Sequence, residues 1–222
     1  IAGAGRTPFQ GVGGSNLTLP AGYPAVSSTV MPASSLQTID LGVDRKRTDL
    51  GASFIAAPGW STSLKFRRDQ REGTQRQGAS FFSSSTQLPV PVDQTTDQIE
   101  AALHYVSAKV QASVGYQASA FRNNVDALTW ANPFTPVVTG ATRASLALSP
   151  DNQFHQVYAS GGFELAPKMR VSGDIAVGRS TQDSAFLPVT LNSSLSTAAL
   201  PAANLGGKVD TFDGRLSVSA AP

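Results

Sequence analysis

The chain has 222 residues, a formal net charge of +2, a hydrophobic content of 41% and no cysteine. The lack of cysteine excludes disulfides, thiolate metal sites, cysteine nucleophiles and covalent haem attachment through a C-x-x-C-H motif. The small charge excess is weak support for nucleic-acid binding. No apolar run approaches the roughly 20 residues of a membrane helix, which excludes a helical membrane protein. A transmembrane barrel is still allowed, because its apolar residues occupy alternate positions.

The first part of the chain differs from the rest. Residues 1–36 are rich in Gly, Ser, Pro and Ala and show no sustained period, which predicts a loop or extended N-terminal arm. Strand-like segments then recur through residues 37–222, which we interpret as the strands of one barrel region. The chain begins with Ile1 and shows no signal peptide, and we expect it to be a mature or excised piece of a longer protein.

Three hairpins and a final strand follow in chain order. The first hairpin has its tight turn at Pro58-Gly59, because apolar and polar residues alternate on both sides of that pair. The second turns near Ser107-Ala108 and the third at Ala166-Pro167-Lys168. The last predicted strand covers about 208–219.

The returning strand of the second hairpin carries the clearest pattern. Residues 109–121 alternate strictly between apolar and small polar side chains. Ordinary strands have about 5–6 residues, whereas a tilted membrane-spanning strand needs about 9–11. The pattern therefore predicts an outer-membrane barrel strand. Its lipid-facing residues are Val110, Ala112, Val114, Tyr116 and Ala118.

Connection lengths support the same fold class. The three turns are very short, whereas the segments 70–95, 122–153 and 180–207 are rich in polar residues and predict long loops. Short periplasmic turns on one rim and long outer loops on the other are typical of bacterial outer-membrane barrels. We therefore predict an all-β protein, an antiparallel transmembrane β-barrel. About eight to ten strands can be drawn, and such a number encloses only enough space for the barrel's own side chains.

The alternation also predicts a polar face that looks into the lumen. Its residues are Glu100, His104, Lys109, Gln111, Gln117, Arg170 and Asp174. Trp60 and Tyr105 lie next to short turns, which predicts that they belong to the aromatic girdle at the periplasmic boundary.

Catalytic and metal-binding signatures are missing from the sequence. There is no G-x-S-x-G, H-E-x-x-H or P-loop motif, so we predict that the protein is not an enzyme. His104 is interpreted as a solvated residue on the polar face of its strand, and His155 as the start of a strand beside a loop. Neither is interpreted as a ligand, and no catalytic, cofactor or metal site is predicted. A basic run is formed by Lys65, Arg67, Arg68, Arg71 and Arg76. It predicts a solvated strand end and loop, or a rim surface that contacts a polar partner or lipopolysaccharide.

Several phrases occur together in a characteristic order. They are Leu88-Pro89-Val90-Pro91-Val92-Asp93, Tyr116-Gln117-Ala118-Ser119-Ala120-Phe121-Arg122-Asn123-Asn124, Leu128-Thr129-Trp130-Ala131-Asn132-Pro133-Phe134, Leu148-Ser149-Pro150-Asp151-Asn152, Phe186-Leu187-Pro188-Val189-Thr190-Leu191-Asn192 and Lys208-Val209-Asp210-Thr211. In this order they resemble the MtrB/PioB family of decahaem-associated outer-membrane proteins, over roughly residues 15–222. Family members are much longer barrels, so the resemblance implies that these residues form a portion of a larger barrel.

The resemblance implies a function and partners. Such a barrel sheathes a periplasmic multihaem c-type cytochrome in the bacterial outer membrane and lets electrons cross, with an outer-surface cytochrome as a further partner. The haem is carried by the partner, and the polar-face residues named above would approach it. Two alternatives stay open. One is a general porin or passive outer-membrane channel, and the other is a soluble extracellular β-sandwich that acts as a binding module.

Overall fold

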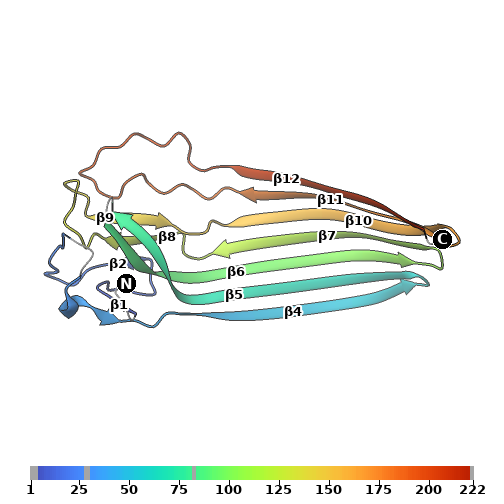
Figure 1. The fold of residues 1–222 in the computed structure, drawn as a ribbon, viewed down its shortest axis with the longest axis horizontal. Coiled ribbons are helices and arrows are strands. Elements are labelled where there is room, and N and C mark those ends of the chain that lie inside the picture. The colour runs from blue at the N-terminus through green and yellow to red at the C-terminus, as the bar shows by residue number, and fades with distance from the viewer. Residues whose placement is uncertain (1–4, 28–30, 82–83, 221–222) are drawn as a thin grey trace.

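The main feature of the molecule is one long antiparallel sheet. The structure is a computed structural model that describes residues 5–27, 31–81 and 84–220. Seven strands form the sheet in the order β12-β11-β10-β7-β6-β5-β4 (Figure 1). Their bounds are β4 Gly42–Ala57, β5 Trp60–Phe81, β6 Ser84–Val106, β7 Val110–Asn123, β10 Asn152–Ala166, β11 Met169–Gln182 and β12 Gly207–Ala220. Among the described residues, no helix is both long and apolar enough to cross a membrane.

The three predicted hairpins are confirmed. Strands β4 and β5, β6 and β7, and β10 and β11 pair as antiparallel neighbours across the predicted short turns. Gly59 adopts a φ of +80° in the first turn, and a Cβ there would press against the carbonyl oxygen of Val106 at 2.6 Å. Lys168 takes a left-handed φ of 68° in the third turn. The last predicted strand, 208–219, is also confirmed as β12.

The prediction of a long loop over 70–95 was wrong. Strand β5 continues to Phe81 and β6 begins at Ser84, so most of this segment is a two-stranded extension of the sheet. Polar residues and two prolines suggested a loop. Pro89 and Pro91 are tolerated because this stretch of β6 pairs only with β5, and an edge position does not require their missing N–H groups.

The other two predicted loops are borne out to different degrees. Residues 122–153 contain two short strands, β8 Ala127–Ala131 and β9 Arg143–Ala147, joined by irregular chain. Residues 183–206 carry no named strand and only an isolated bridge between Ala185 and Asn204. All the long connections lie at one end of the sheet and the short turns at the other, as predicted (Figure 1).

A small hydrophobic core lies at the loop end. It is built by β2 Asn16–Leu17, β8, β9 and the far end of the β5–β6 hairpin, while β1 Arg6–Thr7, η1 Ala33–Ser35 and β3 Gln37–Thr38 lie nearby along the N-terminal segment. We call its buried residues the loop-end core; they are Phe9, Leu17, Phe81, Leu88, Val90, Leu128, Trp130 and Phe134. The predicted N-terminal arm over 1–36 thus contributes core residues where it is described, and the boundary at residue 36 stays a prediction.

The sheet has two open edges. Strands β4 and β12 are its outermost members, and within the described residues neither pairs with a further long strand. The seven strands therefore form an open arc. A closed barrel would need additional strands to pair with these edges.

Candidate functional site

The pairing register gives the sheet two chemically different faces. Cα partners in an antiparallel pair point their side chains to the same side, so one face can be followed from strand to strand. One such row runs Leu103–Val114–Ala159–Ile175 from β6 to β11. The neighbouring row runs His104–Ser113–Ser160–Asp174–Arg215 on the opposite side. We call these sides the apolar face and the polar face.

The apolar face holds every residue predicted to face lipid. Val110, Ala112, Val114, Tyr116 and Ala118 alternate along β7 and pair with apolar or glycine residues at most positions of β6 and β10. Large hydrophobic side chains are exposed across all seven strands on this face, for example Leu50 at 63%, Val114 at 47% and Leu216 at 77%. Leaving one such side chain in water costs about 1.5–3 kcal/mol, so the face requires an apolar surrounding.

The two predicted girdle residues lie together at the short-turn end of the apolar face. Trp60 and Tyr105 are cross-strand partners, and their ring centroids are 4.7 Å apart at an angle of 44°. Such amphipathic rings suit a membrane boundary. Their girdle role stays a prediction.

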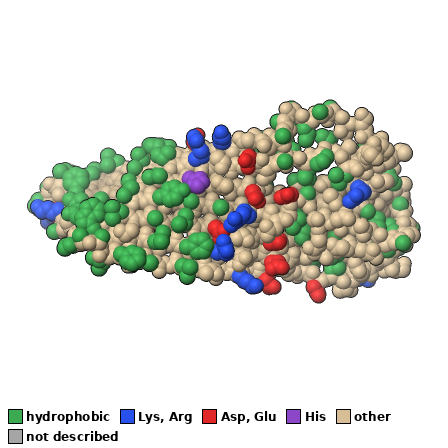
Figure 2. All heavy atoms as spheres, turned by 180° about the vertical axis from the view of Figure 1, so that it is seen from behind, with side chains coloured by type: hydrophobic (Ala, Val, Ile, Leu, Met, Phe, Trp, Pro, Cys, Tyr) green, Lys and Arg blue, Asp and Glu red, His purple; other side chains and the backbone are tan. Residues whose placement is uncertain are grey.

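A row of charged residues borders the apolar face toward the loop end. Asp97 on β6 lies between Arg68 on β5 and Arg122 on β7 and forms ion pairs with both. Further along, Arg179 on β11 pairs with Asp210 on β12 through an Nε–Oδ1 contact of 2.6 Å. We call these five residues the charged belt. Figure 2 shows hydrophobic side chains gathered near one end of this face and a band of charged side chains across its middle.

The apolar zone extends from the short turns to the charged belt, and its height can be worked out from the strand between them. From Val110 at the turn end to Ala120, which pairs with Asp97, β7 spans about 33 Å along the strand. At a strand tilt of about 40°, that length gives a height of about 25 Å, the thickness of the apolar band of outer-membrane barrels. The apolar zone therefore matches the membrane in both chemistry and size.

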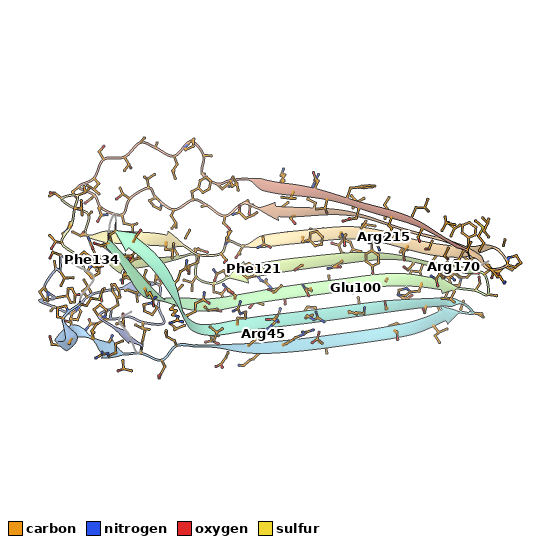
Figure 3. The ribbon with its side chains drawn as sticks, in the orientation of Figure 1. Arg45, Glu100, Phe121, Phe134, Arg170 and Arg215 are labelled. Atoms are coloured by element: carbon orange, nitrogen blue, oxygen red, sulfur yellow. The ribbon has the colours of Figure 1, made fainter. Side chains whose placement is uncertain are left out.

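The predicted lumen residues lie on the polar face, except Lys109, which lies in a turn. Glu100, His104, Gln111, Gln117, Arg170 and Asp174 share this face by register. Lys109 lies in the turn before β7, where its carbonyl oxygen accepts a hydrogen bond from the N–H of Glu164. Figure 3 shows Glu100 along the middle of the sheet and Arg170 at its short-turn end.

Small side chains cover the polar face toward the short turns. A shallow hollow there is lined by His104, Gln111, Ser113, Ser160, Asp174 and Arg215, among others. The hydroxyls of Ser113 and Ser160 share a hydrogen bond of 2.7 Å, and Ser63 Oγ and His104 Nε2 share one of 3.1 Å. Three of the predicted lumen residues, His104, Gln111 and Asp174, therefore lie together around this hollow. Because serine and glycine keep close to the backbone, another surface could approach the sheet closely.

One tyrosine lies flat across the polar face. Gly115 on β7 is the cross-strand partner of Tyr158 on β10, and a Cβ at Gly115 would overlap the Tyr158 ring. The ring crosses β7 and its hydroxyl donates a 2.9 Å hydrogen bond to Oε1 of Glu100. Glu100 also accepts a 3.4 Å contact from Nζ of Lys65 on β5. The glycine therefore allows three strands to be joined by side chains.

Sequence analysis missed an arginine cluster on the polar face toward the loop end. Arg45 and Arg47 of β4 meet Arg67 and Arg71 of β5 around a second hollow. Asp69 pairs with Arg45, and Asp49 pairs with both Arg47 and Arg67. The basic run was noticed only on β5, where alternation sends Arg67 and Arg71 to the polar face and Arg68 to the apolar one. The same alternation along β4 was the available signal.

The described residues offer no evident centre for chemistry. Within 5–27, 31–81 and 84–220, no group of three or more His, Cys, Asp or Glu side chains could hold a metal ion. His104 lies on the polar face, and His155 lies on the apolar face, where its Nδ1 shares a 2.7 Å hydrogen bond with the Tyr116 hydroxyl. The arrangement is that of a wall with two surfaces.

Comparison with known proteins agrees with this architecture. Residues 2–222 match the family described as putative outer membrane beta-barrel porin, MtrB/PioB. A curated relative, Outer membrane protein MtrB of Shewanella baltica (strain OS185), is 34% identical over 215 residues, which is 96% of this chain and 30% of that protein. The chain thus spans about a third of that relative's length. An all-β antiparallel sheet with a membrane-sized apolar face, together with these matches, shows that the chain belongs to the MtrB/PioB family of outer-membrane β-barrel proteins and is located in the bacterial outer membrane.

Proposed function

We propose that these residues form part of a barrel wall that sheathes a periplasmic multihaem c-type cytochrome, so that electrons cross the outer membrane through the enclosed protein. The wall binds no haem itself; the cytochrome carries it. An outer-surface cytochrome is a further partner at the loop end. The barrel acts as a scaffold and insulator and not as an enzyme.

The observation that carries this proposal is the short polar lining of the sheet. Ser113, Ser160 and Ser172 present small side chains over the membrane-spanning part of the polar face. A folded protein inside the barrel could pack against such a surface at short distance and hydrogen-bond to its hydroxyls. The opposite face meets lipid, whose low dielectric constant separates the enclosed haem groups from the surroundings.

A second candidate function rests on the arginine cluster. Arg45, Arg47, Arg67 and Arg71 around one hollow could line a constriction that favours anions, which is the design of a passive porin. Such a pore would conduct ions in planar bilayers without any protein inside. A sheath filled by a cytochrome would conduct few ions.

Copurification and site-directed labelling separate the two functions. The complete barrel protein, tagged and extracted from cells that express multihaem cytochromes, is expected to retain a haem protein that is visible by its Soret absorbance. A Gln111→Cys variant should be shielded from a water-soluble thiol reagent when the cytochrome is present and exposed when it is removed. Thr62→Cys on the apolar face is the matched control, because its labelling depends on the lipid and not on the cytochrome.

Each outcome bears on one function. Equal labelling of Gln111→Cys in the two states would remove the partner-facing assignment of the polar face. Large ion conductance from barrels that carry no haem protein, combined with failure to recover any haem protein, would support the porin instead.

A further inference from the structure

We propose that the charged belt on the apolar face is a binding site for the phosphate groups of lipid A, the membrane anchor of lipopolysaccharide. This inference concerns the lipid side of the wall and does not depend on the proposed sheath function.

The belt lies where lipid headgroups lie. It follows the apolar zone directly on the same face, and the zone's height of about 25 Å places it at a membrane boundary. Bacterial barrels direct their long loops outward. The belt lies a few residues from the loop-side ends of β7 and β11. Its boundary is therefore the outer leaflet, which in this membrane is built of lipopolysaccharide.

The central part of the belt has the chemistry of a phosphate site. Arg68 donates to both carboxylate oxygens of Asp97, from Nε at 2.6 Å and from Nη2 at 2.9 Å. Arg122 donates to Oδ2 of the same carboxylate from the other side. Both guanidinium groups therefore converge on one oxygen atom, and one carboxylate neutralises only one of them. The trio keeps a net charge of +1 and carries many guanidinium N–H donors.

The exposure of the three side chains suits a ligand from the lipid. Arg68 and Arg122 expose 44% and 56% of their side chains, whereas Asp97 exposes 17%. The anion is thus held against the sheet and the two cations face outward. The guanidinium carbon of Arg68 also lies 5.9 Å from the centre of the Phe66 ring, which places this cation at the edge of the apolar zone. Guanidinium groups bind phosphate in a forked, bidentate geometry.

The other end of the belt extends the positive surface. Arg179 pairs with Asp210. Lys208 lies two residues before Asp210 on β12, on the same face and nearer the loops. His155 lies beside Arg179 in the register. A lipid A molecule carries two phosphates and several acyl chains. The trio would take a phosphate, and the exposed apolar side chains below the belt would contact the chains.

The polar face supplies a matched control. Asp49 of β4 also pairs with two arginines, Arg47 of the same strand and Arg67 of β5, but on the side away from lipid. The variant pair is therefore Arg68→Gln with Arg122→Gln on the apolar face, and Arg47→Gln with Arg67→Gln on the polar face. Both pairs remove two positive charges around one carboxylate, the first from β5 and β7 and the second from β4 and β5.

The test measures binding of fluorescent lipid A to the complete barrel protein in detergent micelles. Removing a cation beside an anionic membrane surface weakens attraction about fivefold, so the Arg68 and Arg122 pair should weaken lipid A binding on the order of 25-fold. The Arg47 and Arg67 pair should leave it unchanged. Lipid A without phosphates should bind weakly to every variant, and phosphatidylglycerol should bind weakly to the unaltered protein.

A third variant separates lipid binding from a purely structural ion pair. Asp97→Asn removes the carboxylate and leaves both arginines, so lipid A binding should be kept or strengthened. If the belt only stabilises the sheet, Asp97→Asn and the double arginine variant would lose heat-resistant folding alike, with no change in lipid A affinity of the folded fraction. That result would overturn the proposal, as would equal losses from the two arginine pairs. Preferential binding of phosphatidylglycerol would overturn the assignment to lipid A.

Discussion

An arginine placed on one face or the other of β7 should have very different effects on barrel stability. Val114 lies on the apolar face, and Ser113 next to it lies on the polar face. Along the strand, Val114 is about 13 Å from Val110, which corresponds to a height of about 10 Å within an apolar zone of about 25 Å. Val114 is therefore close to the bilayer midplane.

The expected magnitudes follow from these positions. Val114→Arg should cost about 2–4 kcal/mol in the free energy of unfolding, as for a cation at the midplane of a barrel. Ala120→Arg, at the level of Asp97, should cost only about 0–1 kcal/mol. Ser113→Arg gives up the hydrogen bond to Ser160, which is worth about 0.5–1.5 kcal/mol, but keeps its charge in the wet interior.

Guanidinium titrations of the complete barrel in phospholipid vesicles can measure these differences. The folded fraction is read by tryptophan fluorescence and by the shifted migration of unheated barrels in gels, on protein freed of any cytochrome. The depth assignment would be refuted if Ala120→Arg cost more than Val114→Arg. Equal costs for Val114→Arg and Ser113→Arg would refute the assignment of faces.

Three further predictions concern the polar face, the loop-end core and the open edges. Gly115→Ala should displace the Tyr158 ring from Glu100 and cost about 1–3 kcal/mol of unfolding free energy. Gly51→Ala, whose added Cβ would meet only the Leu64 carbonyl oxygen at an ordinary 3.8 Å, should cost under about 0.5 kcal/mol in the same titration. Leu128→Ala removes a fully buried side chain and should loosen the loop-end core by about 2–5 kcal/mol, seen as faster proteolysis of the loop end with an intact membrane-embedded sheet; unchanged proteolysis would contradict the assigned core. The 222-residue chain expressed alone in detergent should aggregate or stay protease-sensitive, because β4 and β12 expose unpaired edges; a compact, heat-resistant monomer would show instead a complete small barrel.

Much of the wall was predictable because alternation is a local property. The strict pattern over 109–121 predicted both the length of β7 and its two faces, and short turns located the hairpins. The extended β5–β6 hairpin was not predicted, because its polar residues and Pro89 and Pro91 look like a loop when strand pairing is unknown. Alternation of Leu88, Val90 and Val92, all buried, was the signal that those prolines obscured.

The loop-end core and the charged belt depend on contacts between distant residues. Phe9 and Leu17 stand alone in a segment of loop-like composition, and nothing local indicates that they become fully buried. The belt likewise required the pairing of β5, β6 and β7, because only the register brings Arg68, Asp97 and Arg122 to one place.

The parallel contact between β2 and β8 has a consequence for the order of assembly. Leu17 is the strand partner of Trp130, and the N–H of Thr129 donates to the carbonyl oxygen of Ser15. These partners are separated by more than half of the chain, and closing such a loop is slow compared with forming a hairpin. The N-terminal segment should therefore pair with β8 only after the hairpins of β4 to β7 have formed. We therefore expect the loop-end core to form after the strands beside it, with Phe9 and Leu17 buried only at that late stage.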